Sequence, residues 1–189
     1  ILEVLAKHEV KSGDVFYLPA GRVHAIGGGI LLAEIQQSSD VTYRIFDYSR
    51  PGIDGKPREL HTELAAQALD YTVYPEYKTE HRDDTDVAHK LINTPYFSVK
   101  VIEATAPFHR NMLKYDSFII IMNLKGDCRV KMRATDDVIV LPEGNSCLIP
   151  AAIADYDYIP LNGSAKVLEA FVNNSKTLGQ MISDFLRLS

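Results

Sequence analysis

The chain has 189 residues, of which 46% are hydrophobic and 24% charged, and its formal net charge is −5. This is the composition of an ordinary soluble globular protein, long enough for one large domain or two small ones. The negative charge argues against a nucleic-acid partner, which usually needs a basic face, but it leaves an anionic substrate open. No apolar run approaches the roughly 18 residues that span a bilayer, so we expect no membrane segment.

Cys128 and Cys147 are the only cysteines and form no C-x-x-C pattern, which leaves neither a thiolate zinc site nor a disulfide framework. Cysteines in such strand-like contexts are most often small buried hydrophobes. This usage fits a reducing compartment, and we expect a cytoplasmic protein. The first residues, ILEVLAKHEV, have neither a start methionine nor a signal-peptide layout. We therefore expect this chain to be a piece of a longer protein.

The first seventy positions combine strand-like segments with two short helices. Closely spaced apolar residues predict a helix near 1–7, and the helix formers of HTELAAQALD predict another over 61–70. Between them, β-branched and aromatic residues predict three strands, over 15–19, 30–37 and 41–48. The segment SRPGIDGKPRE, with its prolines and glycines, predicts an irregular excursion after the third strand.

The rest of the chain is expected to be a linker followed by a β-rich domain and a helix. Residues 71–92 are polar and without a clear period, which predicts a linker or a long surface loop. From residue 93, strand-like segments separated by Gly, Pro and Asn-Gly turns predict a sandwich or barrel. Its expected core includes Val99, Ile102, Ile119, Ile121, Leu141 and Ile149. Apolar residues at helical spacing predict a terminal amphipathic helix over 175–187.

A short internal repeat links the two halves. GDVFYLPAGRVH, residues 13–24, aligns without gaps to GNSCLIPAAIAD, residues 144–155. His24 then falls opposite Asp155. Such a repeat indicates two copies of one β module, the second of which lacks the histidine.

The stretch GDVFYLPAGRVH also resembles the second signature of the cupins, which are jelly-roll barrels. Its continuation, with AEIQQSSDVTYRIFDY and GKPRELH, resembles the bacterial type I phosphomannose isomerases (mannose-6-phosphate isomerases) from Pro19 to His61. The resemblance implies an all-β fold of two cupin-type jelly rolls, a bicupin. In that fold, 1–70 would be the C-terminal part of the catalytic cupin, and 71–92 a linker or long loop. Residues 93–189 would be a second, degenerate structural cupin with a C-terminal helix.

The same resemblance implies a zinc-dependent enzyme that interconverts mannose 6-phosphate and fructose 6-phosphate through an enediol, with one zinc ion per site. His24 would be one zinc ligand, and the other ligands, which lie upstream in the family, would precede Ile1. Glu34 and Arg44 match a glutamate and an arginine of the family's site and are the candidate catalytic residues. Arg22 departs from the family pattern and would either add phosphate affinity or point to solvent.

These residue types suit the chemistry of an aldose–ketose isomerase. Negative charge builds up on the carbonyl oxygen as the proton leaves carbon, and a nearby cation stabilises that transition state. Zinc can act there as a Lewis acid, with neutral imidazole as a suitable ligand. Arg44 could steady the enediolate oxygens or hold the phosphate. Glu34 could pair with Arg44, transfer a proton or bind sugar hydroxyls, and these roles stay open.

Less specific interpretations of the same residues also stay open. A lone histidine after a turn is usually a surface or satisfied residue, and Glu34 with Arg44 could be a structural cross-strand ion pair. The alternative function is a non-catalytic sugar-binding or regulatory cupin. A second alternative is a cupin enzyme with another metal, although an iron oxygenase needs two histidines and a carboxylate. The expected partner is a small-molecule sugar phosphate.

Overall fold

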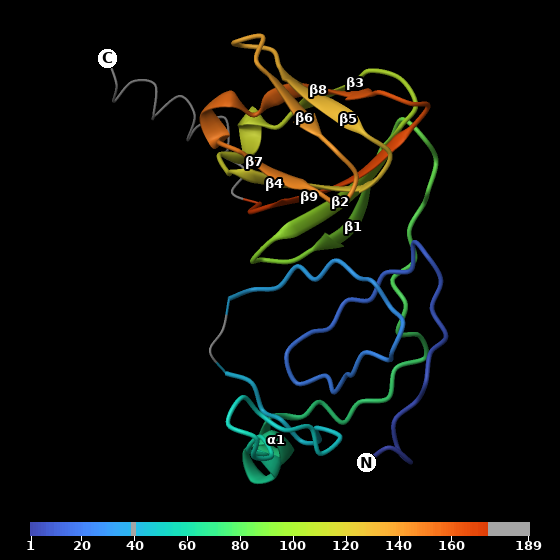
Figure 1. Cartoon of the computed structure of the whole chain (residues 1–189), viewed down its shortest axis with the longest axis vertical. Coiled ribbons are helices and arrows are strands. Elements are labelled where there is room, and N and C mark those ends of the chain that lie inside the picture. The colour runs from blue at the N-terminus through green and yellow to red at the C-terminus, as the bar shows by residue number, and fades with distance from the viewer. Residues whose placement is uncertain (39–40, 174–189) are drawn as a thin grey trace, which may run out of the picture. The chain divides into compact units, whose positions relative to one another are not determined.

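The computed structural model describes residues 1–38 and 41–173, which belong to two compact units (Figure 1). The N-terminal unit comprises Ile1–Thr79, and the C-terminal unit Glu80–Ser189. The boundary between them falls inside the segment 71–92 that the sequence predicts as a linker. Among the described residues, no helix is long and apolar enough to cross a membrane.

The C-terminal unit is built from strands that form two antiparallel sheets (Figure 1). Its strands are β1 (Ala88–Asn93), β2 (Ser98–Ala104), β3 (Phe108–Asn111), β4 (Ile119–Lys125), β5 (Cys128–Met132), β6 (Val138–Leu141), β7 (Ser146–Ile149), β8 (Asp155–Pro160) and β9 (Ala165–Phe171). Two short 3₁₀ helices, η1 (Leu113–Tyr115) and η2 (Ala151–Ile153), lie in the connections.

The strand order is that of a jelly roll. One sheet has the order β1-β2-β9-β4-β7 and the other β3-β8-β5-β6. From β2 to β9 the chain crosses between the sheets at every connection except the β5–β6 hairpin, which is how two interlocked Greek keys are built. The expectation of an all-β, cupin-type fold is therefore confirmed in this unit.

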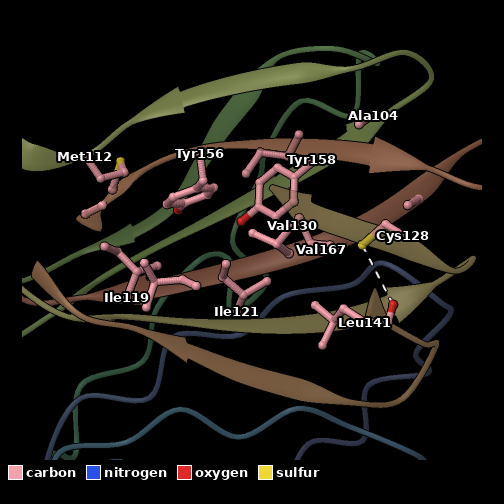
Figure 2. Packing of buried hydrophobic residues seen from close by; sticks show 14 of the residues in the cluster. Ala104, Met112, Ile119, Ile121, Cys128, Val130, Leu141, Tyr156, Tyr158 and Val167 are labelled. Atoms are coloured by element: carbon pink, nitrogen blue, oxygen red, sulfur yellow. Dashed lines mark hydrogen bonds between the residues drawn. The ribbon is translucent and has the colours of Figure 1, made fainter. Parts of the chain in front are cut away.

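The core lies between the two sheets and follows the two-residue period of the strands. In β4, Ile119 and Ile121 are fully buried, whereas Ile120 between them is exposed. Figure 2 shows these side chains meeting others from the facing sheet, among them Val130 and Tyr158. All six residues expected in the core are buried. Five of them belong to this cluster, and Val99, on the opposite face of β2, does not.

Both cysteines have the expected role of small apolar side chains. Cys128 is fully buried in the cluster, with its Sγ 3.8 Å from the carbonyl oxygen of Leu141 (Figure 2). Cys147 is half-buried and packs against the same core. Burial raises the pKa of each thiol to about 11, so both stay protonated at neutral pH.

One charged side chain lies fully buried inside the jelly roll. Glu169 of β9 is 0% exposed, and Arg110 of β3 donates to both of its carboxylate oxygens, at 2.9 Å from Nε and 2.5 Å from Nη2. The hydroxyls of Tyr156 and Tyr158 on β8 each donate to Oε1 at 2.9 Å. Burial raises the pKa of both tyrosines well above its ordinary value, which keeps them as donors. This Glu169 cluster therefore joins the two sheets through a charge whose hydrogen bonds are satisfied.

The predicted strands of the N-terminal unit, over 15–19, 30–37 and 41–48, are not formed. In the described part of this unit, β pairing is limited to single bridges between Phe16 and Lys78 and between Pro51 and Pro57. A strand needs a partner for its backbone N–H and C=O groups, and these segments find none that extends into a ladder. Leu31, near the start of the second segment, is 99% exposed. The bicupin arrangement therefore stays a prediction.

The three predicted helices have different outcomes. The prediction over 61–70 is confirmed by α1 (Thr62–Ala68). The prediction near 1–7 is wrong, because only one turn forms, closed by the Val4 N–H on the Ile1 carbonyl at 3.0 Å. One exposed turn cannot offset the cost of helix nucleation. The helix predicted over 175–187 lies outside the described residues.

One detail of the C-terminal unit differs from expectation. Strand β1 overlaps the end of the segment 71–92, where the sequence predicts a linker or a long surface loop, because pairing with β2 outweighs the weak pattern of AHKLIN. On β3, the exposed His109 lies with its Nε2 2.7 Å from Oδ1 of Asp155. Asp155 is the residue that takes the place of His24 in the second copy of the repeat.

The Glu169 cluster predicts a specific stability effect. Glu169→Gln leaves Arg110 buried without its counter-ion and should lower the free energy of unfolding by about 3–5 kcal/mol. The measurement is urea unfolding followed by tyrosine fluorescence, since the chain has no tryptophan. The control is Glu103→Gln, which removes the same charge from a partly exposed pair with Lys166 at 3.2 Å and should cost less than about 1 kcal/mol. Equal losses in the two variants would contradict this role.

Candidate active site

The loop that carries His24 begins with a tight turn at Pro19–Arg22. The Arg22 N–H donates to the Pro19 carbonyl at 3.2 Å, and Gly21 has a φ of +87°. A Cβ at Gly21 would lie 2.7 Å from the Ala68 carbonyl oxygen at the end of α1. The Asp70 N–H also donates to the Gly21 carbonyl at 2.9 Å. The glycine is therefore required both by the turn and by its close approach to the residues after α1.

Arg22 attaches this loop to the segment that follows α1. Its guanidinium lies over the Tyr74 ring at 4.4 Å and over the Tyr77 ring at 5.5 Å, and Nη1 donates to the Tyr17 carbonyl at 3.2 Å. The Tyr74 hydroxyl in turn donates to Asp70 at 2.8 Å. Arg22 is therefore half-buried in these contacts and does not simply point to solvent, whereas added phosphate affinity stays a prediction.

His24 itself is exposed, and one of its ring nitrogens is engaged. Its Nδ1 lies 3.0 Å from the Arg22 carbonyl oxygen. Because a carbonyl oxygen only accepts, Nδ1 carries the proton in this contact. In the neutral ring the lone pair is then on Nε2, which is the arrangement of a histidine that can bind a metal.

Arg44 is tied through its backbone to His61, the residue that precedes α1. The Arg44 N–H donates to His61 Nδ1 at 3.2 Å, and the His61 N–H donates to the Arg44 carbonyl at 2.7 Å. The side chain of Arg44 is also held, because Nη1 donates to the Glu59 carbonyl at 3.1 Å. The sequence predicts only a helix start at His61, and its reciprocal bonds with Arg44 were not anticipated.

A buried carboxylate that sequence reasoning missed holds the excursion after Arg44. Asp47 is buried and accepts hydrogen bonds from Arg58 at both oxygens and from Arg50 at 3.1 Å. The Arg58 hydrogen bonds lower the pKa of Asp47 below its usual value. Opposite charges on either side of the RPGIDGKP turn were the available signal for this pair.

The three predicted site residues are not bonded to one another in the described structure. Within the described ranges, no hydrogen bond or ion pair joins any two of His24, Glu34 and Arg44, so the cross-strand ion pair is not formed here. Glu34 is exposed. Residues 1–38 and 41–173 contain no group of three or more His, Cys, Asp or Glu side chains that could hold a metal ion.

The turn at Gly21 predicts a local effect on the loop of His24. Gly21→Ala combines a positive φ with the approach to Ala68 and should cost about 1–2 kcal/mol in this unit. Faster proteolysis of the His24 loop would report it. Gly28→Ala is the matched control, since a Cβ there meets no atom within 4 Å. Equal proteolysis rates in the two variants would show that the turn does not constrain the loop.

No family model matches the chain, but several curated proteins are similar to it. It is 35% identical to mannose-6-phosphate isomerase ManA of Bacillus subtilis over 156 residues, which is 82% of this chain and 48% of ManA. It is 29% identical to the mannose-6-phosphate isomerase of Streptococcus mutans over 174 residues, or 90% of this chain and 52% of that enzyme.

A solved structure of a mannose 6-phosphate isomerase is also similar to this chain. The crystal structure of the mannose 6-phosphate isomerase from Bacillus subtilis matches 70% of this chain and 40% of its own, with a TM-score of 0.57 and 25% identity. The chain spans about half the length of the curated relatives it matches. The resemblance seen in the sequence is thus confirmed, and the chain is a homologue of the mannose-6-phosphate isomerases over about half of their length.

Proposed function

We propose that this chain is part of an aldose–ketose isomerase that interconverts mannose 6-phosphate and fructose 6-phosphate. The observation that carries the proposal is the 35% identity to a mannose-6-phosphate isomerase over 82% of the chain. The matching half-length implies that activity also needs the part of the relatives that this chain does not span. The substrate would be a small sugar phosphate, and the place of action the cytoplasm.

Arg44 supplies the positive charge in this proposal. Among the described residues it makes no ion pair with a carboxylate, and Nη1 alone is engaged, with the Glu59 carbonyl. A guanidinium has five N–H donors, so several stay available for the oxygens of an enediolate or of a phosphate. The backbone hydrogen bonds between Arg44 and His61 hold the Arg44 backbone in place. Less conformational entropy of Arg44 is therefore lost when its side chain binds the substrate.

Glu34 is the proposed proton-transfer group. Isomerisation removes a proton from C2 of the aldose and returns one to C1, and a carboxylate can accept and then donate that proton. The exposure of Glu34 and its lack of an ion pair with Arg44 leave its oxygens free for this task. This assignment rests on the position of Glu34 in the family resemblance.

His24 is the proposed ligand of a zinc ion. Its Nε2 has the lone pair that zinc requires, and neutral imidazole is a suitable zinc ligand. The described residues contain no group of three or more possible ligands. The proposal, following the family resemblance, places the remaining ligands in the part of the relatives that this chain does not span. When bound, the metal would act as a Lewis acid toward the sugar carbonyl.

A non-catalytic sugar-binding cupin is the second candidate. The observation that favours it is that, among the described residues, no hydrogen bond or ion pair joins His24, Glu34 and Arg44. A binding protein would need neither the metal nor the proton-transfer group. Enzymatic turnover therefore distinguishes the two candidates.

The role of Arg44 can be tested in a chimera in which this chain replaces the aligned part of Bacillus subtilis ManA. Arg44→Ala should lower kcat/KM by about 100-fold or more, the size of effect seen when one donor to a developing oxyanion is lost. Arg44→Lys keeps the charge and should restore part of the loss. Arg129→Ala, on an exposed position of β5, is the control. Activity of Arg44→Ala within about twofold of the parent would rule out this role.

The role of His24 can be tested by the metal content of the same chimera. His24→Ala removes one ligand and should lower the zinc bound per chain, measured by mass spectrometry after dialysis, by about 10-fold or more at a fixed free zinc concentration. His109→Ala, which removes a surface imidazole paired with Asp155, should leave the zinc content unchanged. An unchanged zinc content in His24→Ala would contradict its assignment as a ligand.

A further inference from the structure

The C-terminal unit contains a cavity of about 340 Å³ whose lining includes none of the proposed isomerase residues His24, Glu34 and Arg44. It lies against β1, β2, the end of β9 and η1. The apolar part of its lining includes the rings of Tyr115 and Phe171. Its polar lining consists of Lys90, Asn93, Ser98, Lys100 and Asn173. No carboxylate belongs to this lining among the residues described.

The strand register places two lysines side by side in this cavity. Lys90 of β1 lies directly opposite Lys100 of β2, and residues directly opposite in an antiparallel pair project to the same face. Lys100 shares its face of β2 with Ile102, which belongs to the core, so both lysines belong to the inner face of the sheet. Like charges in such a pair repel each other and destabilise the sheet.

The nearest carboxylate in the sheet does not neutralise these lysines. Lys100 lies opposite Glu169 of β9. Both oxygens of Glu169 already accept hydrogen bonds from Arg110, and Oε1 also accepts from two tyrosine hydroxyls. In the described ranges neither Lys90 nor Lys100 forms an ion pair, and the Nζ of Lys100 lies 5.7 Å from the ring centroids of Tyr115 and Phe171.

We propose that this lysine cavity binds the phosphate group of a small phosphorylated sugar. The ammonium groups of Lys90 and Lys100 would bind the phosphate dianion, and no carboxylate in the described lining would compete for them. The bound dianion would in turn relieve the repulsion between the two lysines. Asn93 Oδ1 accepts hydrogen bonds from the Ser98 hydroxyl at 2.5 Å and from the Asn173 amide at 3.3 Å, which leaves the Asn93 amide N–H groups and the Asn173 carbonyl oxygen as partners for sugar hydroxyls. The rings offer an apolar face. The cavity volume is at the lower end of the range for small-molecule sites, which matches a monosaccharide phosphate.

The site can be tested by NMR titration of the 189-residue chain with inorganic phosphate, mannose 6-phosphate and mannose at low salt. Both phosphates should shift the amide signals of Lys100, Tyr115 and Phe171 saturably, and mannose should not. Mannose 6-phosphate should bind more tightly than inorganic phosphate, because contacts with its sugar add to the affinity. Lys100→Gln should weaken the binding of both phosphates by about tenfold, the change expected from one lost charged contact.

Lys125→Gln is the matched control, because Lys125 pairs with Lys166 at the end of β9 opposite to Phe171. It should bind both phosphates as the parent does. Lys90→Gln, at an exposed position, gives a second test in a variant whose folding is not at risk. Arg44→Ala should leave these shifts unchanged, so failure of the isomerase proposal would be distinguishable from failure of this one.

Three results would overturn the proposal. The first is the absence of saturable shifts at the lining residues with either phosphate. The second is binding in Lys100→Gln and Lys90→Gln that equals binding in the parent. The third is an equal loss in Lys125→Gln, which would indicate general attraction to surface charge. Equal affinities for inorganic phosphate and mannose 6-phosphate would overturn the sugar part of the assignment.

Discussion

The hydrogen-bonded charge of Glu169 is the constraint around which the jelly roll is organised. An unpaired carboxylate at 0% exposure would cost several kcal/mol, so the fold must deliver donors to it. Arg110 comes from β3 and the two tyrosines from β8, both in the sheet that faces β9. The two sheets can therefore take only a relative position in which these groups meet.

The same cluster determines the electrostatics of the cavity beside it. Because the Glu169 carboxylate is paired with Arg110, it is not available to Lys100, which lies opposite Glu169 in the sheet. The charges of Lys90 and Lys100 then remain in a space lined by amides, a hydroxyl and aromatic rings. A structural ion pair in the core thus creates an unbalanced positive charge nearby, which is the basis for the proposed phosphate site.

The N-terminal unit is held by a different kind of contact. Individual side chains attach loops to one another, as Arg22 does on Tyr74, and Arg58 on Asp47. Backbone pairing is limited to isolated bridges in the residues described. His24 and Arg44 are held by such local contacts, Arg44 through its backbone hydrogen bonds with His61. This arrangement holds each loop locally but does not bring His24, Glu34 and Arg44 into contact.

The sequence predicted those features that depend on local pattern. The period of two in FIIIMN identified the buried face of β4, and HTELAAQALD identified α1. It could not predict that ILLAEIQQ would lack a partner, because strand propensity says nothing about where the pairing backbone lies. The role of Glu169 was missed for a similar reason. AKVLEAF gives an apolar strand with two charges, Lys166 and Glu169, and only the packing of one sheet on the other brings Arg110 to Glu169.

The central claim, that this chain belongs to a sugar-phosphate isomerase, is most directly tested by following the substrate itself. The chimera with Bacillus subtilis ManA would be supplied with zinc and mannose 6-phosphate in deuterated water, and the reaction followed by proton NMR. The account predicts that fructose 6-phosphate forms, with deuterium entering at C1 to the extent that the transferred proton exchanges with solvent. A folded, zinc-loaded chimera that binds mannose 6-phosphate but forms no fructose 6-phosphate would contradict the account and favour a sugar-binding cupin.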